Sequence, residues 1–184
     1  TGDITGIIDG TATLTQLSSA GIVFSSTYFT NDKTSLQAAI TLYNNERNTT
    51  APNRTFESIY GIIEDMKTRY VTDMSRLFYT MSEINPDISN WDTSNVTNMS
   101  LMFYGAYLFN QPLNDWDVSK VTNMSQMFEN AYVFNQPLGG WNVGKVTTMY
   151  QMFGDAFAFN QAIGQWNVSQ VTNMYAMFSG AGAF

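Results

Sequence analysis

The chain has 184 residues and carries 8 Lys or Arg against 15 Asp or Glu, which gives a formal net charge of −7 at pH 7. Because phosphate groups are bound by clustered cationic side chains, this balance argues against nucleic acid and anionic membrane surfaces as partners. The absence of Cys and His removes disulfides, thiolate metal sites and the commonest general base, so we expect no cofactor, no metal site and no enzyme activity.

The first region, residues 1–29, is predicted to form an N-terminal β-strand extension. Its apolar residues fall in short groups, such as Ile7 with Ile8 and Ile22 with Phe24, and Gly and Ser bound these groups. An isolated two-stranded unit is only marginally stable in water. These strands must therefore pack on the rest of the chain, on a further domain or on another molecule.

Residues 30–59 are predicted to form a capping helix and a polar loop. Asn31 or Asp32 is a suitable N-cap for a helix that continues to about Asn45. Its apolar face consists of Leu36, Ala39, Ile40 and Tyr43, at helical spacing. We expect this face to cover the apolar end of the first repeat unit. The loop contains Asn48 and Asn53, which begin N-x-[ST] sequences and are candidate glycosylation sites.

A repeat of 25 residues occupies residues 60–184. The segment FNQPLNDWDVSKVTNMSQMF begins at Phe109, and FNQPLGGWNVGKVTTMYQMF follows it at Phe134. The same register divides the region into five units: 60–84, 85–109, 110–134, 135–159 and 160–184. Self-similarity of this period is typical of proteins in which each unit buries its apolar face against its neighbours. We therefore predict one repeat domain over residues 60–184.

Positions that are apolar in nearly every unit predict the interior. In the third unit these are Leu113, Trp116, Val118, Val121, Met124, Met127 and Phe128. Two columns are assigned structural roles: Trp91, Trp116, Trp141 and Trp166, and Asn85, Asn110, Asn135 and Asn160, whose stacked amides can satisfy backbone groups. The alternation from Trp116 to Thr122 is the period-2 pattern of short strands. The predicted fold class is α/β: a leucine-rich-repeat-like solenoid of five rungs with short strands, a capping helix and the β extension.

The repeat resembles that of a known family. ISNWDTSNVTNMSLMF and FNQPLNDWDVSKVTNMSQMF are similar to the unit of BspA-like leucine-rich-repeat surface proteins, and the likeness extends over about residues 30–184. The resemblance implies a secreted or surface-displayed protein that takes part in adhesion. Val121 departs from the leucine-rich-repeat template, which has Asn or Cys at this place. We expect a flatter coil, with a second short strand near Val121 to Met124 and a turn or helical piece around Met127 to Ala131.

One outward column is a candidate binding face. It consists of Thr72, Thr97, Thr122, Thr147 and Thr172. Evenly spaced hydroxyl and methyl groups could order water or contact a polysaccharide or ice surface. The favoured alternative is that threonine suits an exposed strand position, since the neighbours Asn95, Lys120, Lys145 and Gln170 make the face irregular.

The last unit is a candidate assembly end. Its apolar columns finish at Met174, Met177, Phe178 and Phe184, and no polar capping segment follows in the sequence. Such an end predicts head-to-tail pairing with another chain, for which the strands of residues 1–29 are suitable donors. The alternative that further repeats follow Phe184 remains open.

These features predict a non-enzymatic scaffold for adhesion or recognition at an extracellular or cell-surface location, on the strength of the family resemblance. Its partners would be a protein or glycan surface, or copies of itself. A structural subunit of a fibre or filament is one alternative, and a polysaccharide- or ice-surface binder that uses the threonine column is another. No apolar run approaches the roughly 18 residues of a membrane-spanning helix, so we expect no direct membrane insertion in this segment.

Overall fold

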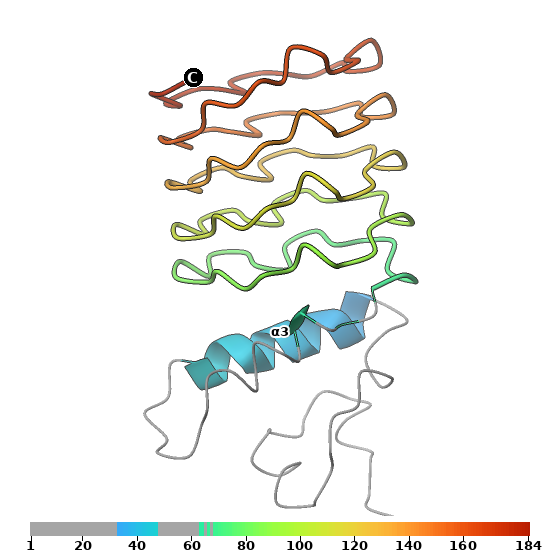
Figure 1. The fold of residues 1–184 in the computed structure, drawn as a ribbon, viewed down its shortest axis with the longest axis vertical. Coiled ribbons are helices and arrows are strands. Elements are labelled where there is room, and N and C mark those ends of the chain that lie inside the picture. The colour runs from blue at the N-terminus through green and yellow to red at the C-terminus, as the bar shows by residue number, and fades with distance from the viewer. Residues whose placement is uncertain (1–32, 48–62, 65, 67) are drawn as a thin grey trace, which may run out of the picture.

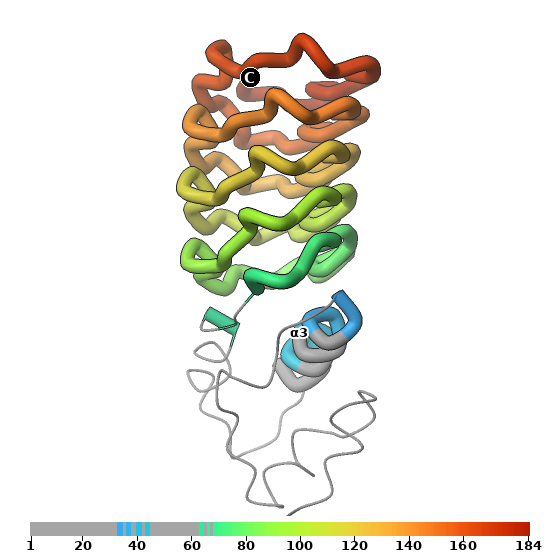
Figure 2. Tube along the Cα trace, turned by 90° about the vertical axis from the view of Figure 1, so that its right-hand side faces the viewer, coloured from blue at the N-terminus to red at the C-terminus, as the bar shows by residue number. Residues whose placement is uncertain are grey.

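The computed structural model describes residues 33–47, 63–64, 66 and 68–184. The predicted β extension over residues 1–29 and the loop with Asn48 and Asn53 lie outside these residues. Within the described part, the helix α3 (Lys33–Arg47) lies beneath a stack of closely similar layers, one for each repeat unit (Figure 1). The tube view shows the same stacking from the side (Figure 2).

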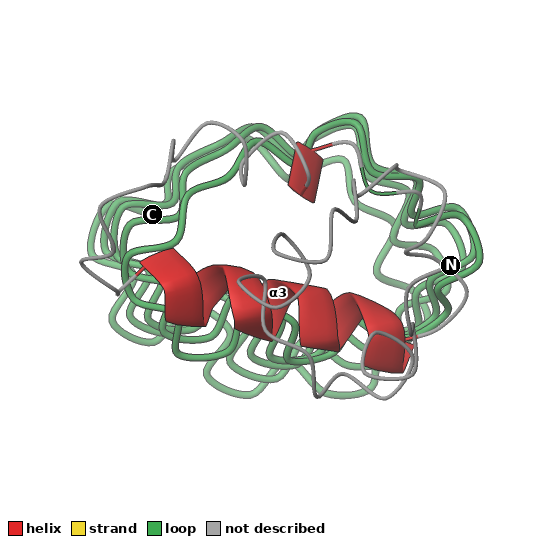
Figure 3. Cartoon of the chain, turned by 90° about the horizontal axis from the view of Figure 1, so that it is seen from below, coloured by secondary structure: helices red, strands yellow, loops and turns green. Residues whose placement is uncertain are grey.

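Helix α3 forms where the sequence predicted a helix and ends two residues later than expected, at Arg47. Its side chains Leu36, Ile40 and Tyr43 are buried, and seen from below the helix runs along one side of the open end of the stack (Figure 3). The Lys33 ammonium contacts the Asp73 carboxylate at 2.9 Å. This contact holds the helix against the first layer, and burial of the three apolar side chains contributes roughly 1.5–3 kcal/mol each.

Each layer consists of consecutive tight turns. Backbone N–H groups donate to the carbonyl three residues earlier all along the unit, as from Trp116 to Leu113 at 3.1 Å and from Val121 to Val118 at 2.9 Å. Later in the same layer, Met127 donates to Met124 at 3.2 Å. The apolar residues recur at this turn spacing, which brings all of them to the inside of the layer.

The predicted α/β class, a leucine-rich-repeat-like solenoid with short strands, is wrong. In the described residues the layers contain no β-strand and form no sheet, and α3 is the one complete helix. Neighbouring layers share only isolated parallel bridges: Asp73 with Asn98, Asn98 with Asn123, Asn123 with Thr148, and Thr148 with Asn173. The strands expected before and after Val121 are therefore single bridge positions between turns.

Backbone conformation explains why strands do not form. Two residues in each layer have a left-handed backbone conformation. In the third layer these are Gln126, with φ 58°, and Asn130, with φ 61°. Left-handed residues cannot continue an extended strand, and they occur singly because they cost L-amino acids energy. The period-2 alternation near Trp116 spans too few residues between turns to extend into a ladder.

Adjacent layers are nevertheless joined by many backbone hydrogen bonds. Phe103 donates to the Met127 carbonyl of the following layer at 2.9 Å, and Thr122 donates to the Thr97 carbonyl of the preceding layer at 2.8 Å. These bonds recur at equivalent positions in the other layers. They satisfy the polar backbone groups that the turns leave unpaired.

The interior consists of side-chain columns that run through the layers. All seven side chains predicted to face inward in the third unit are buried, which confirms that part of the sequence interpretation. Phe78, Phe103, Phe128, Phe153 and Phe178 stack with 5.3–5.6 Å between successive ring centroids. Residues of the same type therefore pack on one another from layer to layer. Because these columns are buried, the candidates for a functional site are the columns that face outward.

Candidate functional site

The threonine column is exposed, but four of its five hydroxyl groups donate to the neighbouring layer. The hydroxyl of Thr97 donates to the carbonyl of Thr72 at 3.0 Å, and that of Thr122 donates to the carbonyl of Thr97 at 3.1 Å. Thr147 and Thr172 repeat the pattern. The hydroxyl protons therefore bond to the backbone of the neighbouring layer, so the column presents methyl groups and acceptor lone pairs to the outside.

The asparagine and tryptophan columns also bond to the neighbouring layer. The Asn85 Oδ1 atom accepts from the Asn110 N–H at 2.9 Å, and the same bond joins Asn135 to Asn110 and Asn160 to Asn135. Each indole N–H donates to a carbonyl of the preceding layer, as from Trp116 to Ile88 at 3.1 Å. The indoles of Trp91, Trp141 and Trp166 do the same.

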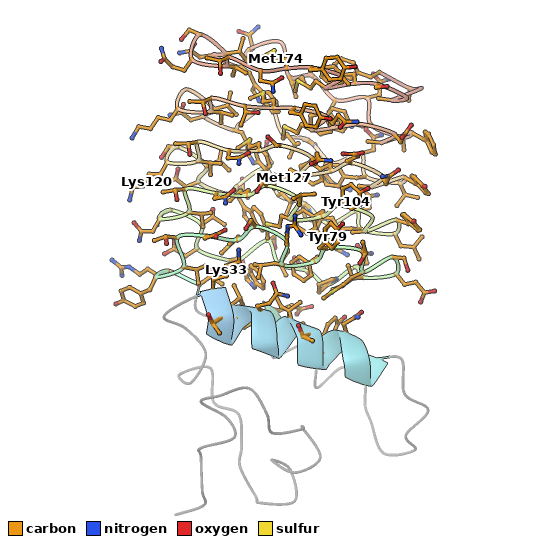
Figure 4. The ribbon with its side chains drawn as sticks, turned by 180° about the vertical axis from the view of Figure 1, so that it is seen from behind. Lys33, Tyr79, Tyr104, Lys120, Met127 and Met174 are labelled. Atoms are coloured by element: carbon orange, nitrogen blue, oxygen red, sulfur yellow. The ribbon has the colours of Figure 1, made fainter. Side chains whose placement is uncertain are left out.

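The residues of the predicted assembly end differ in exposure. Met174 and Phe184 are 40% and 53% exposed, whereas Met177 is buried and Phe178 is partly buried. Figure 4 shows Met174 in the last layer of the stack. Within the described residues, the Met174 and Phe178 N–H groups have no bond, while the equivalent groups of Met149 and Phe153 donate to the last layer. The structure contains one chain, so assembly stays a prediction.

A surface strip that the sequence interpretation missed runs across several layers. We name it the aromatic edge, and it consists of Tyr79, Tyr104, Tyr107, Leu108, Tyr132, Val133 and Phe157. Five of these side chains are between 37% and 51% exposed, and Tyr104 and Tyr132 are partly exposed. Large apolar side chains that cluster on a surface in this way mark interaction sites more often than singly exposed ones do.

Ring stacking organises the aromatic edge into two ladders. Tyr79 and Tyr104 stack with 5.0 Å between centroids. Tyr107, Tyr132 and Phe157 form the second ladder, with centroid separations of 4.5 Å and 4.8 Å. Because each ring lies on the next, most ring faces are covered by neighbouring rings. The edges of the rings and the tyrosine hydroxyl groups are what the ladders present outward.

Carboxylates lie beside the ladders. Desolvation raises the pKa of the Tyr104 phenol, and the negative charge of Glu129 raises it further. Desolvation also raises the pKa of Tyr132, to which the neighbouring Tyr107 and the charge of Asp155 add. Glu129 itself is nearly buried and accepts a bond from Gln126 at 2.7 Å. The edge is therefore apolar and neutral at its rings, with negative charge close by.

Lys120 and Arg76 lie at different places relative to the aromatic edge. Lys120 bonds to the Asn95 side chain at 2.6 Å, and Figure 4 shows it on the side of the stack away from Tyr79 and Tyr104. By contrast, the guanidinium of Arg76 lies over the Tyr79 ring, 5.2 Å from the centroid. Acidic residues occur on both sides, because Asp117 lies near Lys120 while Glu129 and Asp155 lie near the aromatic edge.

Comparison with protein-family models gives two overlapping matches, over residues 49–157 and 115–184, to a single family described as Mycoplasma protein of unknown function, DUF285. Together the matches span residues 49–184, well over half of the chain. The chain belongs to this family. No curated protein and no solved structure matches the chain. The family match covers the repeat region, but the family description names no function. The candidate site is therefore identified from the geometry of the structure.

Among the described residues, no group of three or more His, Asp or Glu side chains could hold a metal ion. Within the same residues, no helix is both long enough and apolar enough to cross a membrane.

A weak signal in the sequence could have revealed the aromatic edge. Its main column reads Ser82, Tyr107, Tyr132, Phe157 and Gly182, so only the three central units carry an aromatic residue. The preceding column holds the buried alanines Ala106, Ala131 and Ala156. An aromatic residue that directly follows a buried small residue at a turn points outward. The signal was obscured because both terminal units lack it.

Proposed function

We propose that this chain is a non-enzymatic recognition module of an extracellular or cell-surface protein, and that it binds a protein partner through the aromatic edge. The observation that carries the proposal is the full or partial exposure of seven neighbouring aromatic and aliphatic side chains on a molecule of net charge −7. Tyrosine is enriched among residues that contribute most to protein interfaces, because it adds large contact area together with a hydroxyl group.

Ring geometry favours a protein over a polysaccharide as the partner. A sugar ring that binds an aromatic residue lies flat on the ring face, where the negative charge of the π system is concentrated. In the ladder of Tyr107, Tyr132 and Phe157 both faces of the central ring and one face of each outer ring are covered by stacking at 4.5 Å and 4.8 Å. Ring edges, hydroxyl groups and the adjacent Leu108 and Val133 remain, and these suit the side chains and backbone of a protein.

The resemblance of the repeat to BspA-like surface proteins supports the location and the adhesive role. That resemblance rests on sequence motifs such as FNQPLNDWDVSKVTNMSQMF and extends over about residues 30–184. The leucine-rich-repeat architecture is not carried over, because the layers consist of turns. From the resemblance we infer only the location outside the cell and the role of a repeat scaffold in contacting another surface.

A binding panel tests the proposal. The purified chain is applied to immobilised extracellular-matrix proteins and, in parallel, to polysaccharides. The test variant combines Tyr107→Ser, Tyr132→Ser and Phe157→Ser, which removes the ladder at exposed positions. It should weaken binding to the retained matrix protein at least about tenfold, which corresponds to roughly 1.4 kcal/mol.

A matched control separates the aromatic edge from the threonine column. Thr97→Ser, Thr122→Ser and Thr147→Ser keep the hydroxyl bonds to the backbone but remove the outward methyl groups. The control should bind like the parent. Retention of the chain on polysaccharides alone would refute the proposal. So would a threonine control that loses binding while the aromatic variant binds like the parent.

A further inference from the structure

Tyrosines in adjacent layers are stacked in three places on the surface. Besides Tyr107 with Tyr132 and Tyr79 with Tyr104, Tyr150 stacks on Tyr175 with 5.9 Å between centroids. Each pair is separated by 25 residues in the sequence, so the pairing is a consequence of the layer register. The closest pair, Tyr107 and Tyr132, has centroids 4.5 Å apart and ring planes only 5° from parallel.

We propose that these pairs are modification sites at which one-electron oxidation joins adjacent layers through dityrosine, with Tyr107 and Tyr132 reacting first. The two rings lie face to face in neighbouring layers, so the two side chains are in direct contact. Because the rings are nearly parallel at this separation, a radical on one ring has the other ring within contact distance. Both rings reach the solvent, because Tyr107 is 41% exposed and Tyr132 is partly exposed.

The remainder of the described structure directs oxidation toward these phenols. The chain has no cysteine to react in their place. The tryptophans are buried, Trp166 at 9% exposure being the most accessible. In the column of Met74, Met99, Met124, Met149 and Met174 the first four are fully buried and Met174 is 40% exposed. One-electron oxidants at the surface therefore meet tyrosine as the main accessible target. A radical formed on one ring of a stacked pair has its coupling partner already in place.

The chemistry balances with hydrogen peroxide and a haem peroxidase as the oxidant. Each phenol loses one electron and one proton to give a tyrosyl radical. The two radicals form one carbon–carbon bond between the ring positions next to the hydroxyl groups. Each coupled carbon then loses its hydrogen as a proton, which moves to the phenoxyl oxygen and restores both aromatic rings. One peroxide molecule accepts the two electrons and the two protons first released and becomes two water molecules.

The product would be a covalent link between layers in a chain that has no disulfide. It would close a loop of 25 residues and so restrict the unfolded chain in the way that a disulfide does. The inference does not depend on the partner proposed above, because it needs only the free chain and an oxidant. We expect the cross-linked monomer to melt at a higher temperature than the untreated chain.

Peptide mapping tests the proposal directly. The full chain is treated at low concentration with peroxidase and hydrogen peroxide, the monomer is isolated, and trypsin is added. Cleavage after Arg76, Lys120 and Lys145 places Tyr107 in peptide 77–120 and Tyr132, as the only tyrosine, in peptide 121–145. The expected product is these two peptides joined, with a mass lower by two hydrogens than their sum and with dityrosine fluorescence.

Two variants show whether the pairing directs the reaction. Tyr132→Phe should abolish the joined product but preserve the stack, because Phe157 occupies the same column without a hydroxyl. Tyr70→Phe is the control, since Tyr70 is 63% exposed and should leave the yield of the joined product unchanged. Unfolding in urea before oxidation should also lower that yield. The proposal is overturned if oxidised monomer lacks the joined peptides, if Tyr70 forms the main cross-link, or if urea leaves the yield unchanged.

Discussion

Replacing Trp116 with alanine tests how much the stacked interior contributes to stability. The indole is 3% exposed, and its ring lies 6.3 Å from that of Phe103 in the preceding layer. Truncating a buried aromatic residue to alanine costs about 3 to 5 kcal/mol, because the surrounding side chains fill the cavity only in part. The variant also removes the indole bond to the Ile88 carbonyl, which keeps its bond from the Trp91 N–H. We therefore expect a loss within that range, most of it from the missing ring.

A second substitution divides this loss into its causes. Trp116→Phe keeps an aromatic ring in the column but removes the N–H that donates to Ile88 at 3.1 Å. The Ile88 carbonyl still accepts from the Trp91 N–H at 3.1 Å, so the loss of the indole bond should cost only about 0.5–1.5 kcal/mol, less than Trp116→Ala. The difference between the two variants then measures the packing of the missing ring volume.

Urea unfolding followed by the fluorescence of the remaining tryptophans measures both losses. Trp166→Ala provides the comparison, because Trp166 lies in the last layer at 9% exposure and its removal should cost less. A free energy of unfolding for Trp116→Ala within about 1 kcal/mol of the parent would show that the interior relaxes around the missing ring. That result would refute the packing argument for the tryptophan column.

Three further predictions concern the turns and the outward columns. Gly105→Ala should destabilise by about 1 kcal/mol in the same assay, because Gly105 has φ +67° and alanine is strained there; an unchanged midpoint would contradict this. Thr122→Val should cost about 0.5–1 kcal/mol, because the hydroxyl bond to Thr97 is lost, and a more stable variant would contradict it. Hydrogen bonds from Ser119 hold the pKa of the Asp117 carboxyl group below its ordinary value of 3.8. The stability that the ionised carboxylate adds to the folded chain is therefore present above pH 3.8 and is lost as the pH falls through the lowered pKa. Asp117→Asn should therefore reduce the loss of thermal stability on acidification, and an acid response equal to the parent's would count against it.

The sequence predicted the interior well because burial recurs with the repeat. Trp116, Met124 and Phe128 are apolar in nearly every unit, and packing of like residues on like residues requires that. The prediction of strands was wrong because the local pattern does not report backbone handedness. Gln126 and Asn130 adopt left-handed conformations although neither is glycine, and only the bonds to the following layer show why they are stable there.

The candidate site was harder to predict than the interior. The threonine column stood out because it is invariant across the units, yet its hydroxyl groups bond to the backbone of the preceding layer. The aromatic edge is irregular in sequence, since Ser82 and Gly182 interrupt the column above and below Tyr107, Tyr132 and Phe157. Positions that pack between layers carry the same type of residue in nearly every unit, whereas the aromatic edge lies at positions where the units differ in sequence.

The role of the asparagine column could be predicted in part from the sequence. Its stacked amides were expected to satisfy backbone groups, and Asn110 does accept from the Asn135 N–H at 3.0 Å. The exact donor could not be deduced from the sequence, because it depends on how the turn at each layer boundary positions the next one. Gln136 adds a bond to the Asn110 carbonyl at 3.0 Å, which the sequence interpretation did not include.

Hydroxyl-radical footprinting of the complex tests the central claim most directly, because it reports the exposure of individual side chains. The chain is labelled alone and with the matrix protein that it retains most strongly in the binding panel. The account predicts reduced labelling at Tyr107, Leu108, Tyr132 and Phe157, and unchanged labelling at Tyr70. Protection of Tyr70 without protection of the aromatic edge would place the partner elsewhere and contradict the account.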